Sequence, residues 1–362
     1  MLMGAVLALG PLAWVWLRQR TADPVRRLQA LTLLTLFLTF DLVLFGAFTR
    51  LTDSGLGCPD WPGCYGNASP VGAQTQIAAA QAAMPTGPVT HGKAWIEMIH
   101  RYLATAVGVL ILVLAVASWM PRKSPASRGV LSPWWPTATL IWVAIQGAFG
   151  ALTVTMKLFP AIVTLHLLGG LVLLALLCLQ AVHYARRHSL QQSVTPDPRV
   201  RWLLGVTAAL VLVQIALGGW VSTNYAVLAC NEFPMCQASW WPDMNFSQGF
   251  TLWRALGMTP DGQPISFAAL TAVHYVHRLM AYAALPLLAL LAWRIESVDG
   301  WPRPAPCLAI LTGLQLPQAL RTLFTSWPRP RALRAPGRWL GGAVCPLVRV
   351  PAAALPAGAV PA

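Results

Sequence analysis

The stretch GAFTRLTDSGLGCPDWPGC, Gly46–Cys64, decides the architecture, because a related stretch, GGWVSTNYAVLACNEFPMC, occurs at Gly218–Cys236. Both begin with a glycine at the end of an apolar run, reach a first cysteine twelve residues later and continue to a second at Cys-x5-Cys spacing. Each is followed by a long loop and an apolar segment with His-Arg, in EMIHR at Glu97–Arg101 and HYVHR at His274–Arg278. The chain is therefore predicted to contain two copies of one unit.

The composition is that of a polytopic membrane protein. Of 362 residues, 56% are hydrophobic and only 10% are charged, with many apolar runs close to the ~20 residues that span a bilayer as a helix. The net charge of +14 does not indicate nucleic-acid binding, because the basic residues alternate with the apolar runs. About eight transmembrane helices are expected, at 2–17, 30–50, 96–119, 134–154, 161–183, 202–222, 266–293 and, most weakly, 304–325.

The distribution of basic residues predicts the orientation. Loops 18–27, 122–128, 186–201 and 294–303 are basic, whereas 51–95, 154–160 and 223–265 carry few cations, which places the second set outside. These outside loops hold the paired cysteines Cys58, Cys64, Cys230 and Cys236, where an oxidising compartment lets disulfides persist. The spacing favours a disulfide or a redox thiol pair over zinc, whose sites use tighter spacing with further ligands nearby.

An even number of spans per copy keeps both copies in one orientation, related by an axis along the membrane normal. The expected fold is all-α, with two pseudo-symmetric four-helix-bundle halves in parallel orientation and a second half that is incomplete. The predicted parts are an extra span with a basic loop (1–29), the N-terminal half (30–183), a basic inside linker (184–201), a partial C-terminal half (202–313) and a Pro- and Arg-rich tail (314–362). The tail has no acidic residue, and a frameshift near 300–320 is one hypothesis for it.

Histidines within the expected spans are the first candidates for function, because ionisable groups at membrane depth are rare and functional by default. Paired intramembrane imidazoles suggest haem iron held between helices. His100 and His166 begin helices two spans apart, which can face each other across a four-helix bundle. A porphyrin between them is the natural proposal. The alternative is that each histidine is simply a polar residue hydrogen-bonded within the core, which is harder to sustain for several histidines at membrane depth. Asp41, inside the second span, is assigned no role.

Several separated motifs now resemble those of the haem A synthase family, membrane enzymes that make the haem of terminal cytochrome oxidases. They are GAFTRLTDSGLGCPDWPGCYG, EMIHR, QGAFGALTVTMKLFPAIVTLHLLGG and VHYVHRLMAY, in the expected order over about 30–313. The resemblance implies eight helices in two halves. The first half binds haem O and oxidises its C8 methyl to the formyl group of haem A, while the second holds a haem b thought to pass electrons.

The resemblance also implies iron ligands and a catalytic carboxylate. His100 and His166 match the N-terminal haem ligands, His277 matches the first C-terminal ligand, and Glu97 matches a carboxylate one turn before His100. Glu97 shares a helix face with His100 and is the candidate proton carrier. His274 occupies the place of that glutamate in the second copy and is not counted as the main ligand.

Other residues are assigned to support these ligands. The resemblance implies the disulfides Cys58–Cys64 and Cys230–Cys236 in the outer loops. Guanidinium groups match carboxylates, so haem propionates near the outer surface are predicted to meet Arg50, Arg101 and Arg278. The expected partners are a haem O synthase, an electron donor and cytochrome oxidase assembly factors, in a bacterial inner membrane, with homo-oligomerisation left open.

The sequence departs from the family where the last helix should carry a fourth histidine, because none follows His277. The haem b site is therefore expected to be incomplete. Two other functions compete: a bis-histidine electron-transfer cytochrome that leaves its haem unchanged, and a parallel-repeat transporter. Glu97 opposes the cytochrome, which has no need of a carboxyl group beside its ligand. The lack of helices broken by Gly or Pro at mid-membrane opposes the transporter.

Overall fold

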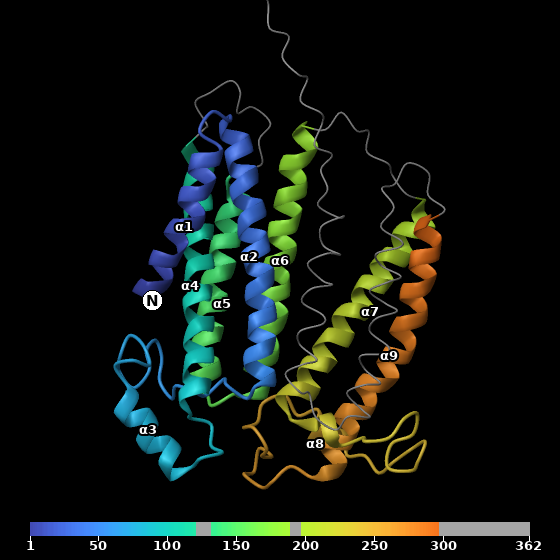
Figure 1. Ribbon diagram of the computed structural model, residues 1–362. Helices are drawn as coiled ribbons and strands as arrows, with labels where there is room; N and C mark the ends of the chain where they lie inside the picture. The colour runs from blue at the N-terminus through green and yellow to red at the C-terminus, as the bar shows by residue number, and fades with distance from the viewer. Residues whose placement is uncertain (121–131, 189–196, 297–362) are drawn as a thin grey trace, which may run out of the picture. The chain divides into compact units, whose positions relative to one another are not determined.

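The computed structural model describes residues 1–120, 132–188 and 197–296, and these form helices joined by loops (Figure 1). The helices are α1 (Leu2–Arg18), α2 (Pro24–Leu51), α3 (Gln74–Ala83), α4 (His91–Trp119), α5 (Trp134–Thr155), α6 (Pro160–His188), α7 (Pro198–Thr223), the 3-10 turn η3 (Ala226–Leu228), α8 (Phe246–Gly249) and α9 (Phe267–Glu296). The expected span 304–325 and the tail 314–362 lie outside the described residues.

Six helices are long and apolar enough to cross a membrane: α2, α4, α5, α6, α7 and α9. They coincide with six of the expected spans, so the prediction of an all-α polytopic membrane protein is confirmed. The first expected span is the helix α1, whose 17 residues extend only ~25 Å at 1.5 Å per residue, somewhat less than the ~30 Å hydrocarbon layer. The sequence did not predict α3, η3 or α8, which lie in the loops expected outside.

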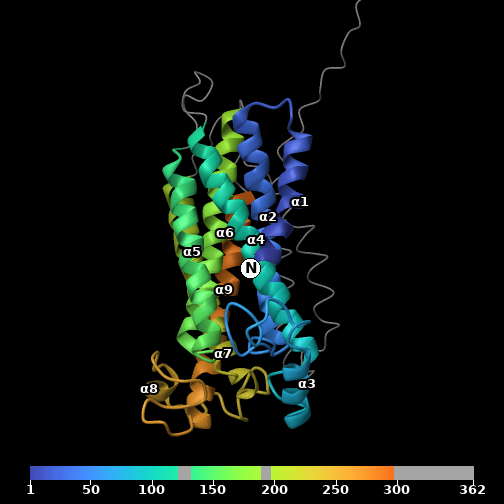
Figure 2. The ribbon, with the colours of Figure 1, turned by 90° about the vertical axis from the view of Figure 1, so that its left-hand side faces the viewer.

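The first four-helix half is a closed bundle. Helix α2 packs against α4 and α6, and α5 packs against the same two helices (Figure 1, Figure 2). Because each of α2 and α5 borders both α4 and α6, the latter two lie diagonally across the bundle. Its interior includes Leu110, Ile111, Leu114 and Leu177, all with no exposed surface. The helices that carry His100 and His166 therefore face each other, as the sequence predicted.

Local signals explain where α2 begins and ends. Asp23 caps its start, because the carboxylate accepts the N–H groups of Val25 (2.8 Å) and Arg26 (3.1 Å), and Pro24 supplies the fixed φ suited to a first turn. Beyond its end, Asp53 adopts the left-handed conformation with φ of 53°. Tyr225, 172 residues later, follows α7 with the same φ of 53°. The helices that precede the two cysteine loops thus terminate in the same way.

The two cysteine loops also share their internal structure. Disulfides join Cys58 to Cys64 and Cys230 to Cys236. In each loop the second cysteine exchanges two backbone hydrogen bonds of 2.9–3.1 Å with the residue three positions on, Asn67 or Ser239. The repeat inferred from cysteine spacing is therefore a repeat of backbone structure.

In both loops an acidic side chain accepts hydrogen bonds from backbone N–H groups of the same turn. The carboxylate of Asp60 accepts the N–H groups of Tyr65 (2.6 Å) and Gly66 (2.7 Å). Glu232, at the equivalent place in the second loop, accepts the N–H of Ala238 (2.9 Å). Both turns use left-handed residues, which leave backbone N–H groups without regular partners, so a nearby carboxylate satisfies them.

Backbone packing divides the chain into two compact units. The first comprises described residues of 1–191, 215–229 and 243–275, and the second those of 192–214, 230–242 and 276–296. The C-terminal part of α7 and the N-terminal part of α9 thus pack with the first bundle. In the second unit, the remaining parts of α7 and α9 pack together through Leu203, Leu291 and Ile295.

Candidate functional site

The central pair of candidate residues is His100 on α4 and His166 on α6. The Nδ1 atom of each imidazole is buried without a hydrogen-bond partner. Buried polar nitrogens are nearly always satisfied, so two imidazoles on facing helices, each with an unpartnered Nδ1, indicate a site that binds a further group.

Glycines on the other two helices make room for these rings. A β-carbon on Gly46 of α2 would lie 3.1 Å from Cε1 of His100, and one on Gly150 of α5 would lie 3.3 Å from Cε1 of His166. Phe45 lies parallel to the His100 ring, with centroids 6.2 Å apart. All four helices therefore shape the histidine site. Gly46 stood out in the sequence only as a repeat marker, and Gly150 was not singled out.

Gln146 is a further residue that the sequence reasoning missed. It lies one turn before Gly150 on α5, is 7% exposed, and its Oε1 is buried without a partner. A β-carbon on Gly169 of α6 would overlap its side-chain amide, so the glycine admits Gln146 against α6. The stretch QGAFG was quoted for the resemblance, but its spacing alone does not reveal which member is buried near His166.

Glu97 is a buried ion-pair partner, 4% exposed. Its Oε1 lies 2.5 Å from Nη2 of Arg101, and its Oε2 accepts the N–H of Cys58 at 2.8 Å. The carboxylate therefore connects the histidine helix α4 to the first cysteine of the loop. It lies on the helix that carries His100, as the sequence predicted, and also has partners that the sequence did not reveal.

Arg101 donates hydrogen bonds to backbone carbonyl groups of the first cysteine loop. Its Nη1 donates to the carbonyl groups of Asp60 (2.8 Å) and Gly63 (2.6 Å), and its Nη2 to that of Cys58 (3.5 Å). The side chain is 7% exposed. The loop and Glu97 thus occupy these donors, and the propionate contact predicted for Arg101 stays untested.

Arg278 repeats this arrangement in the second loop. Its Nη1 donates to the carbonyl groups of Glu232 (2.7 Å) and Met235 (2.8 Å), and its Nη2 to that of Cys230 (3.3 Å). These are the three positions equivalent to those that Arg101 contacts. The arginine after each histidine therefore organises a disulfide loop, and the propionate contact predicted for Arg278 likewise stays untested.

Arg50 lies in a network that joins the ends of α2 and α7. It donates to the carbonyl of Ser222 (2.5 Å) and the hydroxyl of Tyr225 (2.8 Å), whose ring lies 4.1 Å from the guanidinium carbon. The Tyr225 hydroxyl donates to Asp53 (2.6 Å), which also pairs with Lys93 (3.2 Å). Burial and the hydrogen bond to Asp53 raise the pKa of Tyr225, which keeps the hydroxyl a donor. The propionate contact predicted for Arg50 is also untested.

The second copy carries different side chains at equivalent places. His277 on α9 lies with its Nδ1 3.2 Å from the amide nitrogen of Gln214 on α7. His274, in the place of Glu97, has its Nδ1 3.0 Å from the carbonyl oxygen of Ala226. Within residues 1–120, 132–188 and 197–296, no cluster of three His, Cys, Asp or Glu residues could hold a bare metal ion. The paired cysteines form the disulfides described above.

Comparisons with known proteins agree with this arrangement. The family model of COX15-CtaA, described as cytochrome oxidase assembly protein, matches residues 29–334, which extends past the predicted boundary at 313 and leaves α1 outside. A protein of Shewanella oneidensis named heme A synthase is 38% identical over 72% of this chain and 77% of its own length. Two proteins of the same name are more distant. The one from Rhizorhabdus wittichii is 27% identical over 84% of this chain and 89% of its own length. The one from Alkalihalophilus pseudofirmus is 26% identical over 75% of this chain and 77% of its own length.

The match covers both cysteine loops, both His-Arg helices and the helix of His166, which are the parts that build the site. The chain therefore belongs to the COX15-CtaA family of cytochrome oxidase assembly proteins.

Proposed function

We propose that this protein is a haem A synthase, an oxidoreductase that converts the substrate haem O to haem A for cytochrome oxidase assembly. Family membership and relatives named heme A synthase support the activity. The single structural observation that carries it is the pair of imidazoles with a buried, unpartnered Nδ1, His100 and His166, on diagonal helices. Two such nitrogens suit the iron of one porphyrin.

In this proposal His100 and His166 hold the iron of haem O, and the glycines facing them admit their rings. The proposed oxidation of the C8 methyl to a formyl group is oxygen-dependent: it consumes two O2 molecules, four electrons from the donor and four protons, and it releases three water molecules. Glu97 is the proposed proton carrier, because it lies three residues before His100 and is shielded from solvent. Its bonds to Arg101 and Cys58 would hold the carboxylate in place.

We further propose a haem b in the second copy, with His277 as one ligand. The cofactor would supply one-electron transfer to the first site. Gln214 contacts His277, and the sequence has no later histidine to serve as the second ligand. The residues present therefore fit one side of a haem, and the proposal is limited to His277.

The proposed cellular location and partners follow from the same activity. The protein is a multi-pass membrane protein, and we place it in the bacterial inner membrane with both disulfide loops on the outer side, where cations are few. A haem O synthase would deliver the substrate, an electron donor would serve the reaction, and assembly factors would receive the product. Homo-oligomers are compatible with this scheme.

The test is to produce the chain with a haem O synthase in cells that lack their own haem A synthase, and to identify the extracted haems by chromatography and mass spectrometry. Haem A should appear only when the chain is present. A purified protein that carries haem b, with no haem A in the cells, would instead support the electron-transfer cytochrome.

A further inference from the structure

Helix α1 packs closely on the bundle although it lies outside the family match. A β-carbon on Gly4 would lie 2.4 Å from the carbonyl oxygen of Tyr102 and 2.6 Å from Cβ of Thr105, both on α4. Ala8, one turn later, has no exposed surface. Small residues one turn apart let two helices approach closely within a membrane, so α1 is docked on α4 through one fixed face.

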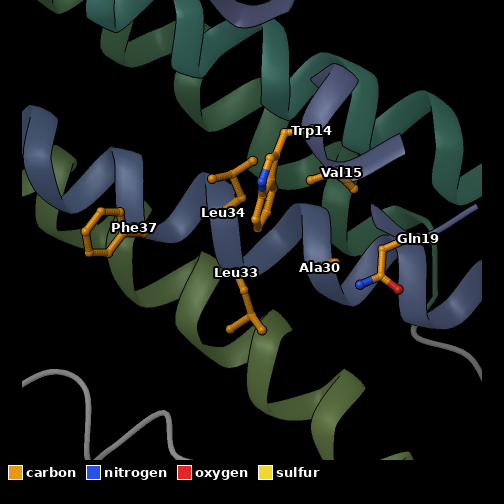
Figure 3. A pocket seen from close by; sticks show the side chains of 7 residues that line it. All are labelled: Trp14, Val15, Gln19, Ala30, Leu33, Leu34 and Phe37. Carbon is orange, nitrogen blue, oxygen red and sulfur yellow. The ribbon is translucent and has the colours of Figure 1, made fainter. Parts of the chain in front are cut away.

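A groove of about 300 Å³ runs between the inner ends of α1 and α2 (Figure 3). Gln19 and Phe37 lie at its two ends, with Trp14 and Leu34 between them (Figure 3). Trp14 and Phe37 are each 54% exposed, so the groove opens to the surroundings of the bundle. For a helix pair in a membrane, those surroundings are lipid chains.

Basic residues gather where Gln19 closes the groove. The turn from 18 to 27 holds four arginines and one aspartate, which gives a net charge of +3. Arg18 and Arg20 flank Gln19 and are exposed, and Asp23 pairs with Arg26 at 3.7 Å. Arg27 donates to the carbonyl groups of Gln19 (2.9 Å) and Arg20 (2.6 Å). The turn is therefore fixed in shape, with two cations directed outward.

We propose that this groove is a binding site for an anionic phospholipid. One acyl chain lies along Trp14, Leu34 and Phe37, and the headgroup phosphate meets Arg18 and Arg20. An apolar channel that ends in fixed positive charge complements an acyl chain with a negative headgroup, and basic clusters at the cytoplasmic ends of helices bind such lipids. The site belongs to the extra helix α1 and does not depend on the proposed enzymatic function.

The test titrates delipidated protein in detergent with phosphatidylglycerol or phosphatidylcholine of the same acyl chains, and counts bound lipid by native mass spectrometry. Phosphatidylglycerol should bind more tightly. The double variant Arg18→Gln/Arg20→Gln should weaken its binding about 25-fold, since each arginine near an anionic headgroup contributes about fivefold. Ala30→Phe, which fills the groove without changing charge, should also weaken it.

The matched control is Arg199→Gln/Arg201→Gln, which removes the same charge from exposed arginines at the start of α7 and should leave binding unchanged. Equal binding of the two lipids, or an equal loss in the control, would overturn the proposal. So would unchanged binding in Ala30→Phe. Disulfide cross-linking between two copies through a cysteine placed at Leu33 of α2, which lines the groove, would show that a second chain occupies the groove instead.

Discussion

The two disulfide loops, with the helices that follow them, are nearly the same scaffold carrying different side chains. In both, an arginine directly after a histidine donates to the carbonyl groups of three equivalent loop residues, and an acidic residue braces the same turn. One turn earlier, however, the first copy has Glu97 and the second has His274. The histidines differ as well, since His100 packs on Gly46 whereas His277 contacts Gln214.

The difference separates residues that position the loop from residues that are proposed to take part in chemistry. Features kept in both copies, the disulfide and the arginine, position the loop. Features present in the first copy alone are Glu97 and an imidazole with an unpartnered nitrogen, and these are the groups that the proposed reaction on haem O would use. Variants made in pairs, one in each copy, can therefore test each role.

The largest effect on stability is expected from removing the loop arginines. Arg101→Gln leaves Glu97 as a buried, unpaired carboxylate, which costs ~3–5 kcal/mol. Arg278→Gln removes equivalent hydrogen bonds but leaves no carboxylate at position 274, so a loss of ~1–3 kcal/mol is expected. Unfolding in mixed detergent micelles measures both. Equal losses of unfolding free energy in the two variants would mean that the ion pair between Glu97 and Arg101 does not stabilise the first loop.

Next comes the pair Glu97→Gln and His274→Gln. If Glu97 carries protons, its glutamine variant should retain bound haem and convert haem O about 100-fold more slowly, at the lower end of the range for acid–base groups. His274→Gln should convert haem O at the parental rate. Single-turnover conversion, with haem content measured in parallel, gives the answer. Unimpaired conversion by Glu97→Gln would remove the proton-carrier role.

A smaller effect is expected at the glycine that faces His166. Gly150→Ala places a β-carbon 3.3 Å from the imidazole and should weaken haem binding about fivefold, for ~1 kcal/mol of overpacking. Gly147→Ala, on the same helix with nothing within 4 Å of the new β-carbon, is the control and should bind haem normally. If both variants bind haem equally well, contact between His166 and α5 does not shape the site.

The smallest effect should come from Tyr225→Phe, which deletes the hydroxyl between Arg50 and Asp53. Asp53 keeps its contact with Lys93, so unfolding should cost no more than ~1 kcal/mol. Thermal unfolding monitored by circular dichroism detects such a change. A loss of several kcal/mol would show that this network, rather than helix packing, holds the ends of α2 and α7 together.

The sequence predicted the framework better than the contacts. Apolar runs located six membrane helices because burial in a bilayer demands continuous apolar length, and cysteine spacing located both loops. The partners of Arg101 could not be predicted, because the direction of a long side chain depends on how α4 is rotated against a loop 40 residues earlier. Gly150 and Gln146 were missed for a similar reason, since their value lies in packing against α6, which no spacing within α5 encodes.

The central claim, that the first copy binds haem O between His100 and His166, is tested most directly by haem analysis of histidine variants in cells supplied with haem O. His100→Ala and His166→Ala should each abolish haem A while the protein still accumulates in the membrane. His183→Ala, an exposed histidine farther along α6, should produce haem A at the parental level. Parental amounts of haem A from either His100→Ala or His166→Ala would contradict the account.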